Sequence, residues 1–176
     1  MENFIQQSRW LCTLAGFVRG IIWYVTGKLN KSGAHLLVHA TKTDQVLCVH
    51  PSSETYLKIL RNIPVICHLP GGGIDAGESP EHAIVREVSE ELCIENVNLS
   101  QAQSASIIVP FGRLRNQVTL YYLEVGEPDE FTFGSPRGGE FTLPHQWRNA
   151  EEAFRYGSIG MQVALKEFNV VSPPES

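Results

Sequence analysis

Apolar residues recur along the chain in short runs with strand spacing. Short runs that alternate or are continuously apolar, and that end at turn-forming residues, are typical of β-strands. Runs of this kind predict strands over residues 34–40, 45–50, 63–69, 106–109, 117–125 and 141–143. The first two flank Thr-Lys-Thr-Asp and therefore predict a β-hairpin.

Two further stretches of the chain have helical spacing. Ser79 can cap a helix and Pro80 suits its first position, so we expect a helix to begin there. Residues 150–168 also have helical periodicity, which is interrupted near Gly157 and Gly160. Because strands and helices share one stretch of chain without internal repeats, the pattern predicts a single α/β domain.

Residues 10–25 form a separate apolar segment near the N-terminus. Their spacing predicts an amphipathic helix packed on the domain, and a buried strand over residues 21–25 is the competing prediction. Arg19 interrupts the apolar run, which is too short to span a bilayer, and Glu2 stands where a signal peptide would be basic. Two glycines in this segment would allow close packing against a second copy, so a homodimer is one option. The expected organisation is an N-terminal extension, one domain and a short tail, at residues 1–30, 31–172 and 173–176.

The composition excludes several classes of protein. With 43% hydrophobic residues and a net charge of -5 over 176 residues, the chain is too apolar for intrinsic disorder. The acidic balance provides no basic surface for duplex nucleic acid, although it leaves a small-nucleotide pocket open. The cysteines have no C-x-x-C pair, so we interpret them as reduced thiols of a cytoplasmic protein: Cys12, Cys48, Cys67 and Cys93.

Two histidines share one face of the first predicted strand. His35 and His39 are four residues apart, so strand alternation puts both on the same side. Metal binding is conceivable there, but no third ligand stands at a helpful spacing. Structural or solvent-facing roles are the favoured interpretation.

The helix after Pro80 carries two adjacent stripes. At about 100° of turn per residue, one arc is apolar and would be buried. The adjoining arc presents Glu87, Glu90 and Glu91 together. Like charges at these spacings repel by roughly a few tenths of a kcal/mol per pair, and a divalent cation would reverse that sign. The alternative is an ordinary solvated acidic face.

The spacing around these glutamates favours the functional interpretation. Gly72 is followed after five residues by Glu78, and after seven more by Arg86-Glu87-Val88-Ser89-Glu90-Glu91-Leu92-Cys93-Ile94. This segment resembles the box of the Nudix hydrolase family, G-x5-E-x7-R-E-U-x-E-E-x-G-U with U apolar. The last glycine is replaced by Cys93. A glycine there usually supplies a left-handed turn, so we expect the helix to end through a different turn without loss of chemistry.

The resemblance implies an α/β/α sandwich around a mixed sheet and a hydrolase that depends on Mg²⁺, for which Mn²⁺ can substitute. Carboxylate oxygens suit such a hard ion, which screens phosphate charge and lowers the pKa of a bound water. The metal ligands that the resemblance implies are Glu87, Glu90, Glu91 and the carbonyl of Gly71. One of the three glutamates would also orient or deprotonate the attacking water. Arg86 and Glu78 would form the family's internal ion pair, unless Glu78 reaches the metals through water.

Candidate substrate contacts lie downstream of the box. Some family members recruit another acid from a later loop, and Glu140 is the candidate because glycines precede it. Arg113 and Arg115 would meet substrate phosphates or, alternatively, form the solvated ends of a hairpin. The implied reaction is hydrolysis of the pyrophosphate linkage in a nucleoside triphosphate, ADP-ribose, a dinucleoside polyphosphate or a similar small nucleotide. The alternatives are a Nudix-like module that binds a nucleotide without cutting it, and an interaction protein that uses the N-terminal segment.

Overall fold

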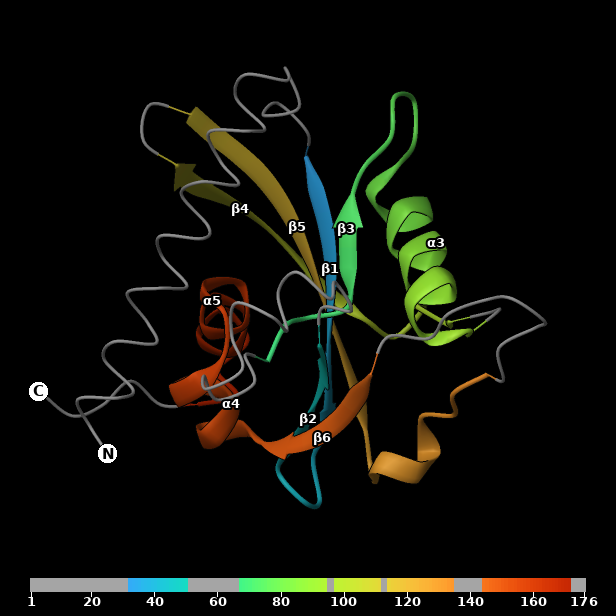
Figure 1. The fold of residues 1–176 in the computed structure, drawn as a ribbon, viewed down its shortest axis with the longest axis vertical. Helices are drawn as coiled ribbons and strands as arrows, with labels where there is room; N and C mark the ends of the chain where they lie inside the picture. The colour runs from blue at the N-terminus through green and yellow to red at the C-terminus, as the bar shows by residue number, and fades with distance from the viewer. Residues whose placement is uncertain (1–31, 51–66, 95–96, 112–113, 135–143, 172–176) are drawn as a thin grey trace, which may run out of the picture.

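The computed structural model describes residues 32–50, 67–94, 97–111, 114–134 and 144–171. They form one sheet with helices on both faces (Figure 1). The strand order is β4-β5-β1-β2-β6, and β3 pairs with β1 off this path. The strands are β1 Gly33–Ala40, β2 Gln45–Val49, β3 Gly71–Gly73, β4 Gln103–Phe111, β5 Leu114–Val125 and β6 His145–Asn149.

Strand β1 is the centre of the sheet. It runs parallel to β5, with Gly33 opposite Val118, and antiparallel to β2 and β3. The remaining pairs, β2 with β6 and β4 with β5, are antiparallel, so the sheet is mixed. The β1–β2 connection is a tight turn in which Asp44 has a positive φ of 52°. The predicted hairpin is therefore confirmed.

The structure confirms some of the other predicted strands and not others. Residues 117–125 fall within β5, and residues 106–109 belong to the longer β4. Strand β6 was not predicted, because its polar sequence HQWRN has no apolar alternation. In its described part, the strand expected at residues 63–69 is reduced to a bridge between His68 and Val49. The strand expected at residues 141–143 and the N-terminal helix lie outside the described residues.

Helices bury both faces of the sheet. Helix α3, Pro80–Leu92, covers one face, and α4, Ala150–Tyr156, and α5, Ile159–Glu167, cover the other (Figure 1). On β1, Leu36 and Leu37 point to opposite faces, and both are fully buried. Leu36 belongs to the core under α3, and Leu37 to the core under α5. The expected α/β/α sandwich with a mixed sheet is confirmed.

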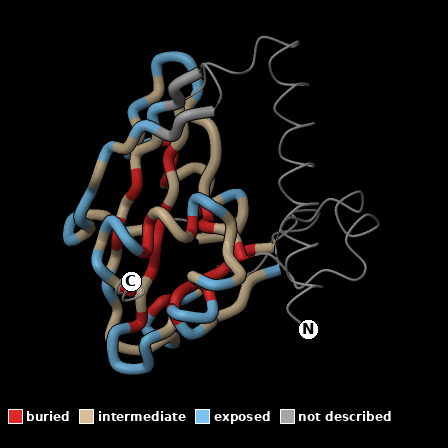
Figure 2. The backbone as a smooth tube through the Cα atoms, turned by 90° about the vertical axis from the view of Figure 1, so that its left-hand side faces the viewer, coloured by how far each residue is buried: buried red, intermediate tan, exposed pale blue. Residues whose placement is uncertain are grey.

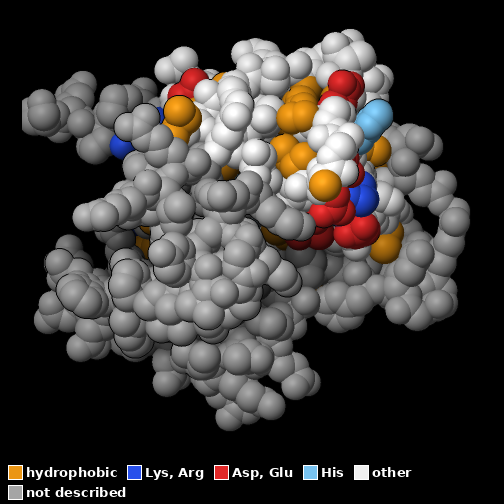
Figure 3. Space-filling view, turned by 90° about the horizontal axis from the view of Figure 1, so that it is seen from above, with side chains coloured by type: hydrophobic (Ala, Val, Ile, Leu, Met, Phe, Trp, Pro, Cys, Tyr) orange, Lys and Arg blue, Asp and Glu red, His pale blue; other side chains and the backbone are white. Residues whose placement is uncertain are grey.

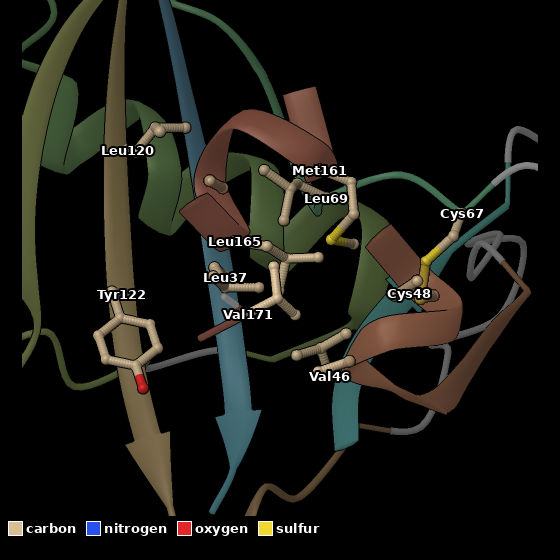
Figure 4. Packing of buried hydrophobic residues seen from close by; sticks show 13 residues of the cluster. Leu37, Val46, Cys48, Cys67, Leu69, Leu120, Tyr122, Met161, Leu165 and Val171 are labelled. Carbon is tan, nitrogen blue, oxygen red and sulfur yellow. A yellow bond between two sulfur atoms is a disulfide. The ribbon is translucent and has the colours of Figure 1, made fainter. Parts of the chain in front are cut away.

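Buried residues concentrate along the middle of the sheet, and exposed residues lie mostly on turns and outer helix faces (Figure 2). In the core under α5, Leu37 and Val46 from the sheet meet Met161 and Leu165 from the helix (Figure 4). Full burial of one such side chain stabilises the fold by about 1.5–3 kcal/mol. The two cores therefore fix the sheet from both sides, and α3 packs on one of its faces.

The C-terminal helical stretch breaks where one of its two glycines predicts. Helix α4 ends before Gly157, and α5 is capped by Ser158, whose hydroxyl accepts a hydrogen bond from the Met161 amide at 3.3 Å. Gly160 lies within the first turn of α5 and causes no break. The predicted interruption is confirmed at Gly157 only.

Two of the cysteines form a disulfide, so their interpretation as reduced thiols is wrong. Cys48 on β2 is bonded to Cys67, with their Cα atoms 5.1 Å apart, beside the core under α5 (Figure 4). The bridge between Val49 and His68 brings together positions that are 19 residues apart in sequence, and spacing alone does not reveal this. Disulfides are rare in the cytoplasm, so the bond removes the basis of the cytoplasmic expectation. Cys93 takes no part in this disulfide.

In the part of the chain that the structure describes, no helix has the length and apolar character needed to cross a membrane.

Removal of the disulfide is expected to lower stability. For the double variant Cys48→Ser/Cys67→Ser we expect the free energy of unfolding to fall by about 3 kcal/mol, because the cross-link restricts the unfolded chain. Urea denaturation with and without a dithiol reductant measures this, and the reductant should destabilise the wild type but leave the variant unchanged. Recovery of both cysteines as separately alkylated peptides from the unreduced wild type would show that the bond does not form.

Candidate active site

The site begins at β3, which is built of three glycines. Gly71 has a φ of 131°, and a Cβ there would collide with the Ala34 carbonyl on β1. A Cβ on Gly72 would lie 2.5 Å from the carboxylate carbon of Glu87 on α3. Only glycine allows β1, β3 and α3 to approach one another this closely.

Helix α3 begins as the sequence predicts. The Ser79 hydroxyl accepts a hydrogen bond from the His82 amide at 3.2 Å, and Pro80 occupies the first turn. Ala83, Ile84, Val88 and Leu92 are buried against the sheet. This packing turns the adjoining stripe of Glu87, Glu90 and Glu91 toward the glycine strand and the solvent beside it.

The expectation that α3 ends through a different turn is wrong. Cys93 adopts the left-handed conformation itself, with φ 56° and ψ 33°, and its amide donates to the Ser89 carbonyl at 3.0 Å. A non-glycine residue in this region costs about 1–2 kcal/mol. The cysteine therefore takes over the cap geometry of the missing glycine, and the carboxylates upstream keep an unbroken helix.

Arg86 connects strand β3 and the loop that follows it to helix α3. Its Nε and Nη2 donate to the two carboxylate oxygens of Glu78, each at 3.0 Å, and Nη2 also donates to the Gly73 carbonyl at 2.9 Å. Its Nη1 donates to Glu87 at 2.9 Å and lies 3.5 Å from a carboxylate oxygen of Glu90. The structure thus brings Glu78 and Arg86 into the contact that the resemblance implied.

These contacts shift the pKa values of Glu78 and Arg86. Hydrogen bonds from Arg86, and next from the Asp75 amide at 2.9 Å, lower the pKa of Glu78 to about 2. The carboxylate of Glu78 and, to a smaller extent, that of Glu87 raise the pKa of Arg86 above its usual value. Both side chains are therefore charged across the whole neutral range.

Glu91 lies in a different environment. Burial, together with the nearby charges of Glu87 and Glu90, raises its pKa to about 7, although the Gly71 amide donates to its Oε2 at 2.8 Å and opposes the shift. The side chains of Glu87 and Glu90 are 16% and 61% exposed. The acidic stripe therefore grades from a half-buried carboxylate to a solvated one (Figure 3 shows acidic side chains gathered beside a basic one).

The donor set fits a hard divalent cation. Three carboxylates lie on one side of α3, and their mutual repulsion helps to raise the pKa of Glu91. Carboxylate oxygens are the ligands that Mg²⁺ prefers. Within the described ranges, however, no three His, Cys, Asp or Glu side chains converge on one point, and Arg86 binds Glu87 and lies near Glu90. The chemistry fits, because Arg86 contacts one oxygen of each of these two carboxylates and the other oxygen can still bind a cation.

The predicted substrate contacts are not placed by the structure. Glu140 and Arg113 lie outside the described residues, and Arg115 lies on β5 with its side chain outside them. Two acidic residues in the segment after β5 make contacts of their own. Glu130 accepts a hydrogen bond from the Gly126 amide at 2.8 Å, and Glu127 lies 3.8 Å from Lys42. Those two carboxylates therefore hold the turn after β5.

The structure also places His35, for which the sequence favours a structural or solvent-facing role. Burial, and then the neighbouring His68, lower its pKa to about 4, so the ring is neutral near pH 7. It lies on β1 directly opposite Gly71 of β3. His39, by contrast, bonds Tyr122 at 3.0 Å and Asp44 at 3.2 Å and is structural. The signal for His35 would have been its pairing with the glycine strand, which depends on tertiary structure.

Comparison with known proteins identifies the family. A NUDIX domain profile matches residues 30–166. The structure is similar to the E. coli dihydroneopterin triphosphate pyrophosphohydrolase, with 21% identity, a TM-score of 0.53 and coverage of 80% of this chain and 97% of that one. It is also similar to the C. elegans Ap4A hydrolase, with 17% identity, a TM-score of 0.52 and coverage of 80% and 96%. The NUDIX domain of Shewanella oneidensis NrtR, complexed with ADP-ribose, has 13% identity, a TM-score of 0.54 and coverage of 81% and 89%.

At these identities the solved structures establish the fold. No curated protein matches the chain. The family profile, however, covers most of the sequence, including the acidic helix and the sheet. The chain therefore belongs to the NUDIX family, and its class is that of the Nudix hydrolases.

The ion pair of Glu78 predicts a pH-dependent stability difference. The folded pKa of about 2 lies below the ordinary value of 4.5, so ionised Glu78 stabilises the fold fully above pH 4.5 and less as pH falls toward 2. Glu78→Gln should therefore lower the free energy of unfolding more at pH 7 than at pH 3, as measured by urea denaturation. Glu81→Gln, on an exposed position of the same helix, is the control. An equal loss at both pH values would contradict the assigned ion pair.

Proposed function

We propose that this Nudix hydrolase cleaves the pyrophosphate linkage of a nucleoside diphosphate joined to another group, with Mg²⁺ held by its acidic stripe. The observation that supports the proposal is the stripe itself: Glu87 and Glu91 contact the glycine strand, and Glu90 lies beside them on the same side of α3. On stability alone such crowding is unfavourable. A site for a cation gives the crowding a purpose.

The ligands would be the carboxylates of Glu87, Glu90 and Glu91, with the Gly71 carbonyl as a backbone ligand. When bound, Mg²⁺ neutralises phosphate charge and lowers the pKa of a coordinated water. The chain supplies the placement of the carboxylates. Arg86 holds Glu87 at 2.9 Å and ties it to the Gly73 carbonyl, while the Gly71 amide holds Glu91 at 2.8 Å.

The proposed reaction transfers one phosphoryl group to water. The water oxygen forms a bond to phosphorus, the bridging P–O bond breaks, and the second phosphate leaves with the bridging oxygen. A glutamate of the acidic stripe accepts the proton of the water. Glu78 and Arg86 touch neither the water nor the phosphorus in this scheme, and they act by fixing the loop against the helix.

The substrate class is also a proposal. The similar structures are named for dihydroneopterin triphosphate and Ap4A, or contain ADP-ribose. All three compounds contain a phosphoanhydride joined to a larger organic group. We therefore propose a small nucleotide of this kind, with residues 31–172 as the hydrolase domain, and with Arg113, Arg115 and Glu140 as candidate contacts to it.

A second function, nucleotide binding without cleavage, is favoured by one observation. Arg86 bonds Glu87 and lies beside Glu90, so two of the proposed metal ligands already have a cationic neighbour. Suppose the folded wild type cuts no nucleotide with Mg²⁺ or Mn²⁺, while a nucleotide still raises its melting temperature. The binding function then replaces hydrolysis.

Loss of a single carboxylate tests the proposed hydrolysis. Glu87→Gln, Glu90→Gln and Glu91→Gln should each lower turnover by about 100-fold, equivalent to about 2.7 kcal/mol of transition-state stabilisation. EDTA should abolish turnover, and Mg²⁺ or Mn²⁺ should restore it. The assay is nucleotide release from a panel of nucleoside triphosphates, ADP-ribose and dinucleoside tetraphosphates.

The matched control is Glu151→Gln, an exposed glutamate on α4 across the sheet. It removes one negative charge without touching the acidic stripe, so turnover should stay within twofold of the wild type. Turnover that survives EDTA, or an equal loss in the control, would contradict the proposed metal site.

A further inference from the structure

Strand β3 lies between two side chains from different elements. On one face, the carboxylate of Glu87 occupies the space where Gly72 would carry a Cβ, with Oε1 2.5 Å from that position. On the other face, His35 Nδ1 lies 2.9 Å from the position of a Cβ on Gly71. His35 Nε2 lies 3.4 Å from the corresponding position on Gly33, so the imidazole covers two glycines on neighbouring strands.

This strand has little means of fixing its own backbone. Three consecutive glycines have no side chains to pack, and glycine has the widest choice of backbone conformations. Hydrogen bonds hold the two ends of the strand, from the Leu36 amide to the Pro70 carbonyl at 3.0 Å and from the Ile74 amide to the Ser32 carbonyl at 2.9 Å. Between these ends the strand pairs with β1, and packing against Gly71 adds a second constraint on its backbone.

The orientation of the Gly71 peptide matters because Gly71 contacts the acidic stripe. Its amide donates to Glu91 Oε2 at 2.8 Å, so this backbone contact helps to place one of the three carboxylates. The φ of 131° belongs to a region that other residues rarely adopt, so Gly71 cannot be replaced by a residue with a packing side chain. The packing must come from a neighbour, and His35 is in position to supply it.

We propose that His35 is a positioning residue for the metal site: its imidazole packs behind Gly71 and fixes the amide that holds Glu91. The proposal rests on the proposed function, because it takes Glu91 to be a metal ligand. His35 touches neither metal nor substrate and acts through the glycine strand. Residues that orient metal ligands from behind typically change metal affinity by about 10–100-fold when they are replaced.

Mn²⁺ binding to the full chain tests the proposal without requiring turnover. For His35→Ala we expect the dissociation constant for Mn²⁺, measured by calorimetry, to rise about tenfold. His35→Phe keeps a planar ring and should recover most of the affinity. Amide hydrogen exchange at Gly71 should be faster in His35→Ala than in the wild type.

His39→Ala is the matched control. His39 lies four residues further along β1 on the same face, and it contacts Tyr122 and Asp44 instead of the glycine strand. It should lower the melting temperature while leaving Mn²⁺ affinity and Gly71 exchange unchanged. This separates positioning from a general loss of stability.

Several results would overturn the proposal. The first is wild-type Mn²⁺ affinity in His35→Ala, and the second is an equal loss in His39→Ala. If His35→Ala does not fold, His35→Phe is the test: a folded His35→Phe that binds Mn²⁺ about tenfold more weakly than the wild type would overturn the proposal. Absence of Mn²⁺ binding in the wild type would remove the metal site and this proposal together. Wild-type Mn²⁺ binding without hydrolysis of any nucleotide would remove the proposed hydrolysis alone, and the positioning role would stand on the affinities of the variants.

Discussion

The guanidinium of Arg86 is the group on which the geometry of the acidic stripe depends. It donates to Glu78 through two nitrogens, to the Gly73 carbonyl and to Glu87. A guanidinium offers five N–H donors in a rigid fork, whereas the ammonium of lysine offers three donors on a flexible stem. One arginine therefore fixes the loop, the glycine strand and the helix relative to one another, and it offsets part of the repulsion between the carboxylates.

The rest of the fold keeps these elements in place. Strand β1 is buried on both faces, so it is fixed between the core under α3 and the core under α5. It pairs with the glycine strand and carries His35 behind Gly71. The disulfide joins β2 to Cys67, three residues before Pro70, whose carbonyl is bound by β1. A continuous set of contacts thus runs from the centre of the sheet to Glu91.

Much of this arrangement could be predicted from sequence because it is local. The Ser79 cap, the two stripes of α3 and the β1–β2 hairpin depend on residues within a few positions of one another. The resemblance to the Nudix box also implied the contact between Glu78 and Arg86, in which one partner lies on the helix and the other just before it.

The features that were missed depend on long-range pairing. The disulfide needs the bridge between β2 and the segment before β3, and β6 is a polar strand that forms by pairing with β2. The positioning role that we propose for His35 also depends on the register of β1 against β3. At Cys93, the local preference for glycine was correctly recognised, but the helix tolerates a strained cysteine instead of changing its turn.

The position of a bound metal ion tests the proposed metal site most directly. Crystals grown with Mn²⁺ and an imidodiphosphate analogue of a nucleotide would locate the ion by anomalous diffraction. We expect Mn²⁺ to be coordinated by carboxylate oxygens of Glu87, Glu90 and Glu91 and by the diphosphate of the analogue, with Arg86 still bound to Glu78. An analogue bound elsewhere, with no metal on the acidic stripe and with Arg86 still bound to Glu87, would contradict it.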